Sequence, residues 1–198
     1  QPSNYYQLVS MPSEFQMQWL MTIGGSVGSE ANLFFVGTTG SQGPAVWLLP
    51  GRTGLSVTYG ADYDWCRVTD STSRSPGEET LKVAVVLRHN VACEDTCPGN
   101  PSYAFDGDCD DGGAGSEYTH CDDLGTDCAD CGMQDSTLEL WVNEQLMGST
   151  SCAGKRPVYG EQSFYGSHGG YPSAPVCLSP LTYGPIPSPP PSPPPLPP

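Results

Sequence analysis

The chain has 198 residues, with 22 acidic residues against seven Lys and Arg and a net charge of −15. So few cations cannot form a basic patch for phosphate, which excludes nucleic acid as a partner and makes cations natural ones. No apolar run reaches the roughly 18 residues that a membrane-spanning helix needs. Nine Cys, 24 Gly and 21 Pro are typical of a secreted, loop-rich protein. The chain begins at Gln1 without a signal peptide, as expected of a mature chain whose signal was removed.

Alternating apolar and polar residues predict strands along most of the chain. Residues 1–13 form a short arm with two tyrosines, and from Phe15 to Ile23 every second residue is apolar. Glycine- and proline-rich turns separate further runs, and no stretch has a helical period of 3.6. Many short strands at this spacing predict an antiparallel sandwich. The predicted strands are 15–23, 32–36, 45–49, 54–59, 64–68, 80–88 and 137–142.

Four of these segments resemble laminin-G and concanavalin-like jelly rolls. They read NLFFV at 32–36, PAVWLLP at 44–50, LKVAVVL at 81–87 and LELWVNEQLM at 138–147. The resemblance implies an all-β antiparallel jelly-roll sandwich over residues 14–92 and 133–184. It also implies a hairpin at 140–146, where Glu144 replaces the usual glycine. Residues 83–88 and 137–142 are expected to pair across the base of the segment between them.

That segment, residues 93–132, is expected to be a disulfide-rich insert. It holds six cysteines and eleven acidic residues without any Lys or Arg, so only disulfides or a bound cation can hold its shape. Asp106, Asp108, Asp110 and Glu117 have the 1, 3, 5, 12 spacing of a calcium loop, although Asp111 stands where an EF-hand needs glycine. The candidate Ca²⁺ ligands are Asp106, Asp108, Asp110, Asp111, Glu117, Asp127 and Asp130.

Two other interpretations of the insert stay open. The acidic loop could be held by disulfides alone, or Cys93, Cys97, Cys128 and Cys131 could form a four-thiolate zinc site. An oxidising compartment favours disulfides over zinc. The insert resembles a small cysteine-rich module of green-algal extracellular proteins and, distantly, the Notch-type LNR modules, which hold Ca²⁺ within three disulfides. This resemblance implies Ca²⁺ binding.

The cysteine pairing inside the insert cannot be derived, because six cysteines allow 15 pairings. The six are Cys93, Cys97, Cys109, Cys121, Cys128 and Cys131. Outside the insert we favour a disulfide between Cys152 and Cys177, which leaves Cys66 buried alone or bonded to another chain.

The last 46 residues divide into an aromatic loop and a proline-rich tail. Residues 153–184 are interpreted as a long loop over the sandwich, whose exposed aromatics suit a sugar ring or a proline-rich strand. These candidate partner-binding residues are Tyr159, Phe164, Tyr165, Tyr171 and Tyr183.

The tail, residues 185–198, contains ten prolines and is expected to form polyproline II, about 43 Å long at 3.1 Å per residue. It resembles hydroxyproline-rich repeats of algal and plant wall glycoproteins, which implies hydroxylation and O-linked sugars. The expected glycosylation positions are Pro187, Ser188, Pro189, Pro190, Pro191, Ser192, Pro193, Pro194 and Pro195. Because polyproline II has no internal hydrogen bonds, we expect the tail to dock in a groove of a neighbouring copy.

No pattern of catalytic residues is found. Glu139 and Glu144 lie five residues apart, on opposite faces of the expected strand, and no nucleophile motif accompanies the three histidines. The four tryptophans lie in predicted strands and are expected in the core. We therefore expect a non-enzymatic structural subunit of an extracellular filament or matrix, self-associating through the tail or the N-terminal arm. The alternative is a carbohydrate-binding lectin of the cell wall.

Overall fold

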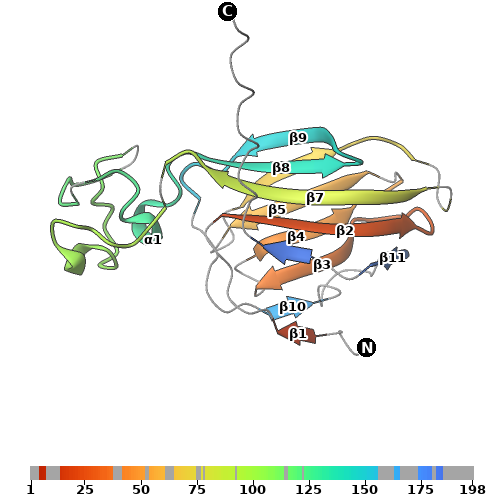
Figure 1. Cartoon of the computed structure of the whole chain (residues 1–198), viewed down its shortest axis with the longest axis horizontal. Coiled ribbons are helices and arrows are strands. Elements are labelled where there is room, and N and C mark those ends of the chain that lie inside the picture. The colour runs from red at the N-terminus through yellow and green to blue at the C-terminus, as the bar shows by residue number, and fades with distance from the viewer. Residues whose placement is uncertain are drawn as a thin grey trace, which may run out of the picture.

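The computed structural model shows two antiparallel six-stranded sheets packed face to face, with a separate lobe at one end (Figure 1). The structure describes residues 5–7, 14–37, 42–51, 54–60, 65–74, 77, 79–91, 93–113, 116–121, 123–155, 163–165, 174–179 and 182–184. The predicted all-β jelly-roll sandwich is thus confirmed. No helix among these residues is long and apolar enough to cross a membrane.

Sheet one has the order β1-β10-β3-β4-β5-β6. Its strands are β1 (Tyr5–Gln7), β10 (Ser163–Tyr165), β3 (Ala31–Gly37), β4 (Gln42–Leu48), β5 (Leu55–Gly60) and β6 (Cys66–Asp70). Sheet two has the order β11-β2-β7-β8-β9, and β12 pairs with the same strand, β2, as β11. Its strands are β11 (Val176–Leu178), β2 (Phe15–Ile23), β7 (Thr80–His89), β8 (Ser136–Val142), β9 (Gln145–Ser151) and β12 (Thr182–Gly184).

The period-two pattern determines which side chains form the core. In β2 the side chains from Phe15 to Ile23 alternate between buried and partly exposed, and β8 alternates in the same way. Their inward residues pack against sheet one in one large apolar cluster. The outer face of sheet one is also covered, because Phe35, Ala45 and Trp47 form a second buried cluster. The outer face of sheet two instead carries polar side chains such as Gln16 and Lys82.

The expected pairing across the base of the insert is confirmed. Val83 to His89 of β7 pair in register with Val142 to Ser136 of β8. The expected hairpin follows, with Asn143 and Glu144 as its two-residue turn at φ of 50° and 66°. Both positive φ values are those of a type I′ turn, whose hand matches the twist of the strands. Lys82 Nζ donates to Glu144 Oε1 at 2.9 Å, across to the neighbouring strand.

The predicted Cys152–Cys177 disulfide is wrong. Cys66, at the start of β6, bonds to Cys152, just after β9, and so joins an edge of one sheet to an edge of the other. Cys177 is exposed and unpaired. It lies in β11, and β11 adds to sheet two at the edge opposite β9, so the two cysteines are separated by the whole width of the sheet.

The prediction of a long loop at 153–184 is also wrong in part, because three short strands lie within it. β10, β11 and β12 each have three residues, and β10 pairs with β1 of the N-terminal arm. Within the described ranges, helix is limited to a 3₁₀ turn at Pro101–Tyr103 (η1) and one turn at Cys128–Cys131 (α1).

Candidate functional site

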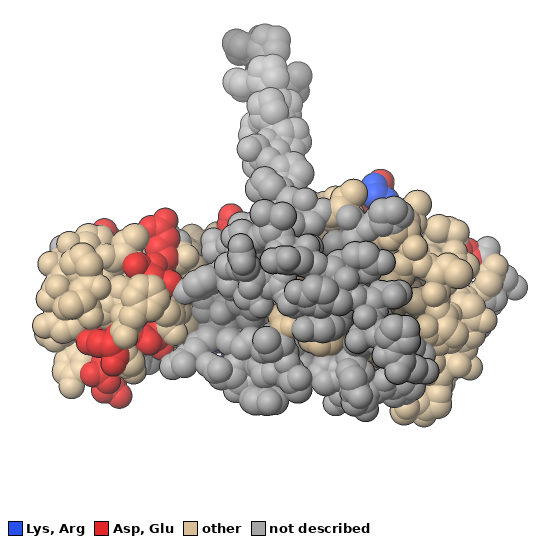
Figure 2. All heavy atoms as spheres, turned by 90° about the horizontal axis from the view of Figure 1, so that it is seen from below, with Lys and Arg blue, Asp and Glu red and all other residues tan. Residues whose placement is uncertain are grey.

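Two regions carry clustered polar chemistry, and the first is the cysteine-rich lobe. Its acidic side chains gather on the surface, separate from the main body (Figure 2). Three disulfides frame it: Cys93–Cys128, Cys97–Cys121 and Cys109–Cys131. Cys93 and Cys128 belong to the large core cluster of the sandwich, so this disulfide joins the lobe to the main body. All four cysteines of the zinc hypothesis lie in disulfides, which excludes a thiolate site.

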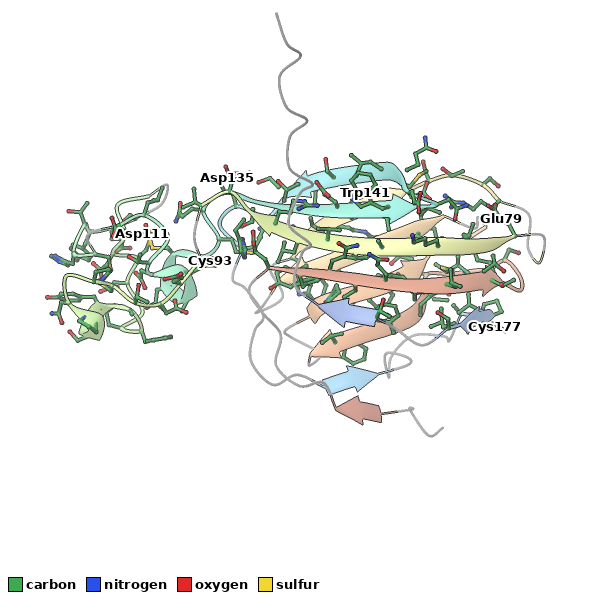
Figure 3. The ribbon with its side chains drawn as sticks, viewed as in Figure 1. Glu79, Cys93, Asp111, Asp135, Trp141 and Cys177 are labelled. Carbon is green, nitrogen blue, oxygen red and sulfur yellow. A yellow bond between two sulfur atoms is a disulfide. The ribbon has the colours of Figure 1, made fainter. Side chains whose placement is uncertain are left out.

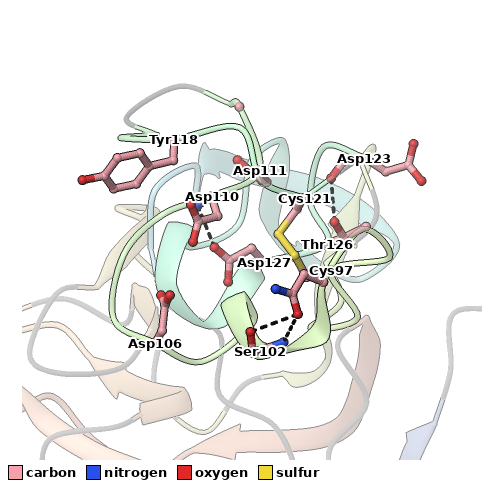
Figure 4. Close-up of a disulfide and its surroundings, with 12 residues drawn as sticks. Cys97, Ser102, Asp106, Asp110, Asp111, Tyr118, Cys121, Asp123, Thr126 and Asp127 are labelled. Atoms are coloured by element: carbon pink, nitrogen blue, oxygen red, sulfur yellow. Dashed lines mark hydrogen bonds between the residues drawn. A yellow bond between two sulfur atoms is a disulfide. The ribbon is translucent and has the colours of Figure 1, made fainter.

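Three carboxylates are buried inside the lobe, those of Asp110, Asp111 and Asp127, with 1%, 5% and 0% of their surface exposed. The backbone N–H of Asp110 donates to Asp127 Oδ2 at 2.8 Å (Figure 4). Both carboxylate oxygens of Asp110 and Oδ1 of Asp127 have no hydrogen-bond partner among the described residues. Burying an ionised carboxylate without a partner is costly, so such oxygens indicate either protonation or a bound cation.

Neighbouring acids increase this cost. Burial raises the pKa of Asp127 to about 6, and the charges of Asp130, Asp110 and Asp111 add to the shift, while the bond from Asp110 N–H opposes it. Burial also raises the pKa of Asp110. Asp106, Asp108 and Asp130 push it further up, and His120 opposes them. Six carboxylates, those of Asp106, Asp108, Asp110, Asp111, Asp127 and Asp130, therefore lie close enough to interact.

Asp111 and Glu117 differ from the other predicted ligands. Asp111 accepts backbone N–H bonds on both oxygens, from Gly113 and from Gly125 at 2.8 Å each, so it shapes the loop where an EF-hand would have glycine. Glu117 is exposed and is not among the charges that raise the two pKa values. The structure thus groups six of the seven predicted ligands, among which Asp111 already accepts a backbone N–H bond on each oxygen.

Among the described residues, the group with metal-ligand spacing is Cys109, Asp111 and Cys131, whose ligand atoms lie within 4.8 Å of one another. The two sulfurs form a disulfide, so they cannot act as thiolate ligands. No three carboxylates of the described residues converge as closely. A cation at Asp110 and Asp127 must therefore draw their neighbours inward.

The second region is a groove of about 240 Å³ on the outer face of sheet two. Strands β2, β7 and β8 supply its floor, and Figure 3 shows Trp141 on β8 of this sheet. The cross-strand register places Gln18, Ala84 and Trp141 in one row and Gln16, Val86 and Glu139 in the next. The lining residues are Gln16, Gln18, Lys82, Ala84, Val86, Arg88, Trp141 and Glu144.

Trp141 is half-buried, with its indole held in place on the sheet. Its Nε1 donates to Glu139 Oε2 at 2.9 Å, and the same oxygen lies 3.5 Å from Arg88 Nε. At the other end of the groove Lys82 pairs with Glu144. Both cations of the groove are thus matched by carboxylates, and the groove is neutral although the chain is strongly acidic.

The prediction that all four tryptophans are core residues is wrong for Trp141. Trp19 and Trp47 are buried, with 3% and 5% of their surface exposed, and Trp65 is half-buried. The alternation of β8, which places Leu138, Leu140 and Val142 inside, places Trp141 outside. This signal was present in the sequence.

The other predicted site residues cannot be compared. Tyr159, Tyr171 and the glycosylation positions from Pro187 to Pro195 lie outside the described residues. Phe164, Tyr165 and Tyr183 are described in their backbone alone, in β10 and β12.

Comparison with known proteins supports the fold. No protein-family model matches, and no curated protein matches the sequence. Among solved structures, the heptameric SAP-like pentraxin from Limulus polyphemus superposes with a TM-score of 0.50 at 9% identity, over 92% of this chain and 70% of the pentraxin chain.

Two further matches have TM-scores below 0.5. Sheep galectin-11 gives 0.43 at 8% identity, over 91% of this chain and 96% of that chain. The endo-β-1,4-glucuronan lyase from the fungus Trichoderma reesei gives 0.49 at 8% identity, over 93% and 76%. At 9% identity the pentraxin match shows the jelly-roll sandwich fold alone.

Proposed function

We propose that the protein is a carbohydrate-binding module whose binding site is the groove around Trp141. The observation that supports this is an outward indole on a sheet face, surrounded by amides and paired charges. The apolar face of a sugar ring packs on an indole, and its hydroxyls both donate and accept hydrogen bonds. Because both cations are paired with carboxylates, the proposed ligands are neutral glycans.

A glycan array followed by calorimetry on the strongest hit tests this proposal. Trp141→Ala should weaken binding about tenfold or more, since loss of roughly 1.4 kcal/mol of aromatic contact corresponds to that factor. Leu178→Ala removes an exposed apolar side chain on β11, outside the groove, and should leave the affinity unchanged. A silent array, or equal affinity of wild type and Trp141→Ala, would contradict the proposal.

A second proposed activity is Ca²⁺ binding by the lobe. It is supported by the three unpartnered oxygens of Asp110 and Asp127, with Asp106, Asp108 and Asp130 as the further ligands. Oxygen ligands and convergent negative charge suit a hard cation. The ion would neutralise the buried charge and hold the lobe together.

Calorimetric titration with CaCl₂ should give saturable binding that Asp127→Asn abolishes. Asp123→Asn removes the same charge from an exposed side chain that points away from the cluster (Figure 4), so it should preserve binding. Equal loss of Ca²⁺ binding in both variants would mean that net charge alone explains the binding, and it would refute the site.

The other expectations from the sequence stay predictions. Four disulfides fit secretion into an oxidising compartment. The absence of catalytic activity, the glycosylated hydroxyproline-rich tail and self-assembly into filaments rest on the sequence alone. Assembly through the tail requires that residues 185–198 reach a second copy.

A further inference from the structure

The chain leaves its last described strand at the edge of the Trp141 groove. β12 pairs with β2 so that Gly184 lies opposite Gln16, and Gln16 lines the groove. The proline-rich segment 185–198 therefore begins one strand away from the groove floor. Residues 185–198 themselves lie outside the described part of the chain.

The chemistry of the groove fits a proline-rich strand. Polyproline II presents backbone carbonyls without internal partners and apolar ring faces, and it is recognised by aromatic grooves with nearby donors. Trp141, Val86 and Ala84 supply an apolar floor. The side-chain amides of Gln16 and Gln18 make no hydrogen bond within the described residues, so they are available as donors.

The reach is short. From β12 across β2 and β7 to β8 there are three strand spacings, about 14 Å at roughly 4.8 Å each. About five polyproline II residues at 3.1 Å span that distance, and fourteen residues follow Gly184. A tethered segment also has a high effective concentration at a site beside its attachment point, which favours its own groove over that of another copy.

We propose that residues 185–198 dock in the groove of their own chain and cover Trp141. The tail then acts as an internal ligand that a glycan must displace. The proposal rests on the groove and not on carbohydrate binding, so failure of one leaves the other testable.

Paramagnetic broadening in the full-length chain tests the docking. Cys177→Ser removes the exposed free thiol, and Ser192→Cys then carries a nitroxide on the tail. We expect the indole N–H resonance of Trp141 to broaden. The resonance of Trp47, which is buried on the outer face of sheet one, should stay sharp. An excess of unlabelled peptide with the sequence of residues 185–198 should displace the tail and restore the Trp141 resonance.

Two controls make the result decisive. An equal excess of a fourteen-residue Gly-Ser peptide should restore nothing, because it lacks proline rings. In a mixture of isotope-labelled chain without nitroxide and unlabelled chain with nitroxide, Trp141 should stay sharp. Broadening that the proline-rich peptide cannot reverse would overturn docking, and broadening in the mixed sample would assign the groove to the tail of a second copy.

Discussion

At the scale of single residues, Asp127 makes the stability of the ion-free lobe depend on pH. Its pKa is about 6 in the fold, against an ordinary value of 3.8. The fold thus disfavours the carboxylate, and the penalty is complete above pH 6 and disappears as the pH falls through 6 toward 4. With a chelator present, this residue should make the protein more stable at pH 5 than at pH 7 by about 1 kcal/mol, which is part of the roughly 3 kcal/mol that the whole pKa shift represents.

Thermal unfolding with a chelator at both pH values measures this difference. Asp127→Asn should remove this contribution to the pH dependence, whereas Asp123→Asn should keep it. With saturating Ca²⁺ the protein should instead be more stable at pH 7 than at pH 5, because the ion binds the carboxylate and protonation competes with it. An identical pH profile in wild type and Asp127→Asn would show that the buried carboxyl does not carry the effect.

At the scale of elements, the β8–β9 hairpin contains a turn residue that is costly in its conformation. Glu144 holds φ at 66°, where glycine is unstrained. Glu144→Gly should raise the free energy of unfolding by about 0.5–1 kcal/mol, because relief of the strained φ outweighs the loss of a solvent-screened ion pair with Lys82. Urea denaturation measures it. Glu144→Ala keeps the strain and loses the pair, so a gain in this variant would refute the explanation.

The disulfide between β6 and the end of β9 should be the main covalent support of the sandwich. Cys66 and Cys152 are 86 residues apart and join two sheet edges. Replacing both by alanine should lower the free energy of unfolding by about 2–4 kcal/mol. Cys177→Ser should change it by less than about 0.5 kcal/mol because the side chain is exposed and unpaired. Equal effects would indicate that Cys177 forms a disulfide in solution.

Local patterns in the sequence predict those strands and strand pairs that depend on neighbouring residues alone. The alternation in residues 15–23 predicted β2 and its buried face, and the strands flanking the insert predicted the β7–β8 pair. Three-residue strands such as β10 and β11 are too short for a period to appear, so the sequence predicts a loop there. The Cys66–Cys152 bond depends on which sheet edges meet, which spacing along the chain does not encode.

For the acidic motif too, the sequence predicts where the site lies but not which of its residues are ligands. The spacing of Asp106, Asp108 and Asp110 identified the region, because alternating carboxylates on a turn are a local feature. It did not separate ligands from loop-shaping residues. That distinction requires burial and backbone partners, which leave Asp110 unpartnered and give Asp111 two N–H donors.

At the scale of the whole molecule, we propose that the sandwich (14–92 and 133–184) and the insert (93–132) are separable units. The base of the insert packs into the sandwich core through Cys93 and Cys128, whose Cα atoms lie 5.2 Å apart. Replacing residues 95–126 by a short Gly-Ser linker keeps that disulfide and removes the acidic lobe. The variant should remain folded and lose Ca²⁺ binding, as checked by near-UV circular dichroism and calorimetry. Loss of the near-UV signal would show that the lobe is needed for the sandwich to fold.

Because we propose that ligands bind on the outer face of sheet two, the most direct measurement is a two-dimensional NMR titration of the isotope-labelled full chain with the strongest glycan hit. We predict that the largest chemical-shift changes fall on the indole of Trp141 and the side-chain amides of Gln16 and Gln18, with the lobe unaffected. Shifts concentrated in residues 93–131 instead, with Trp141 unchanged, would contradict it.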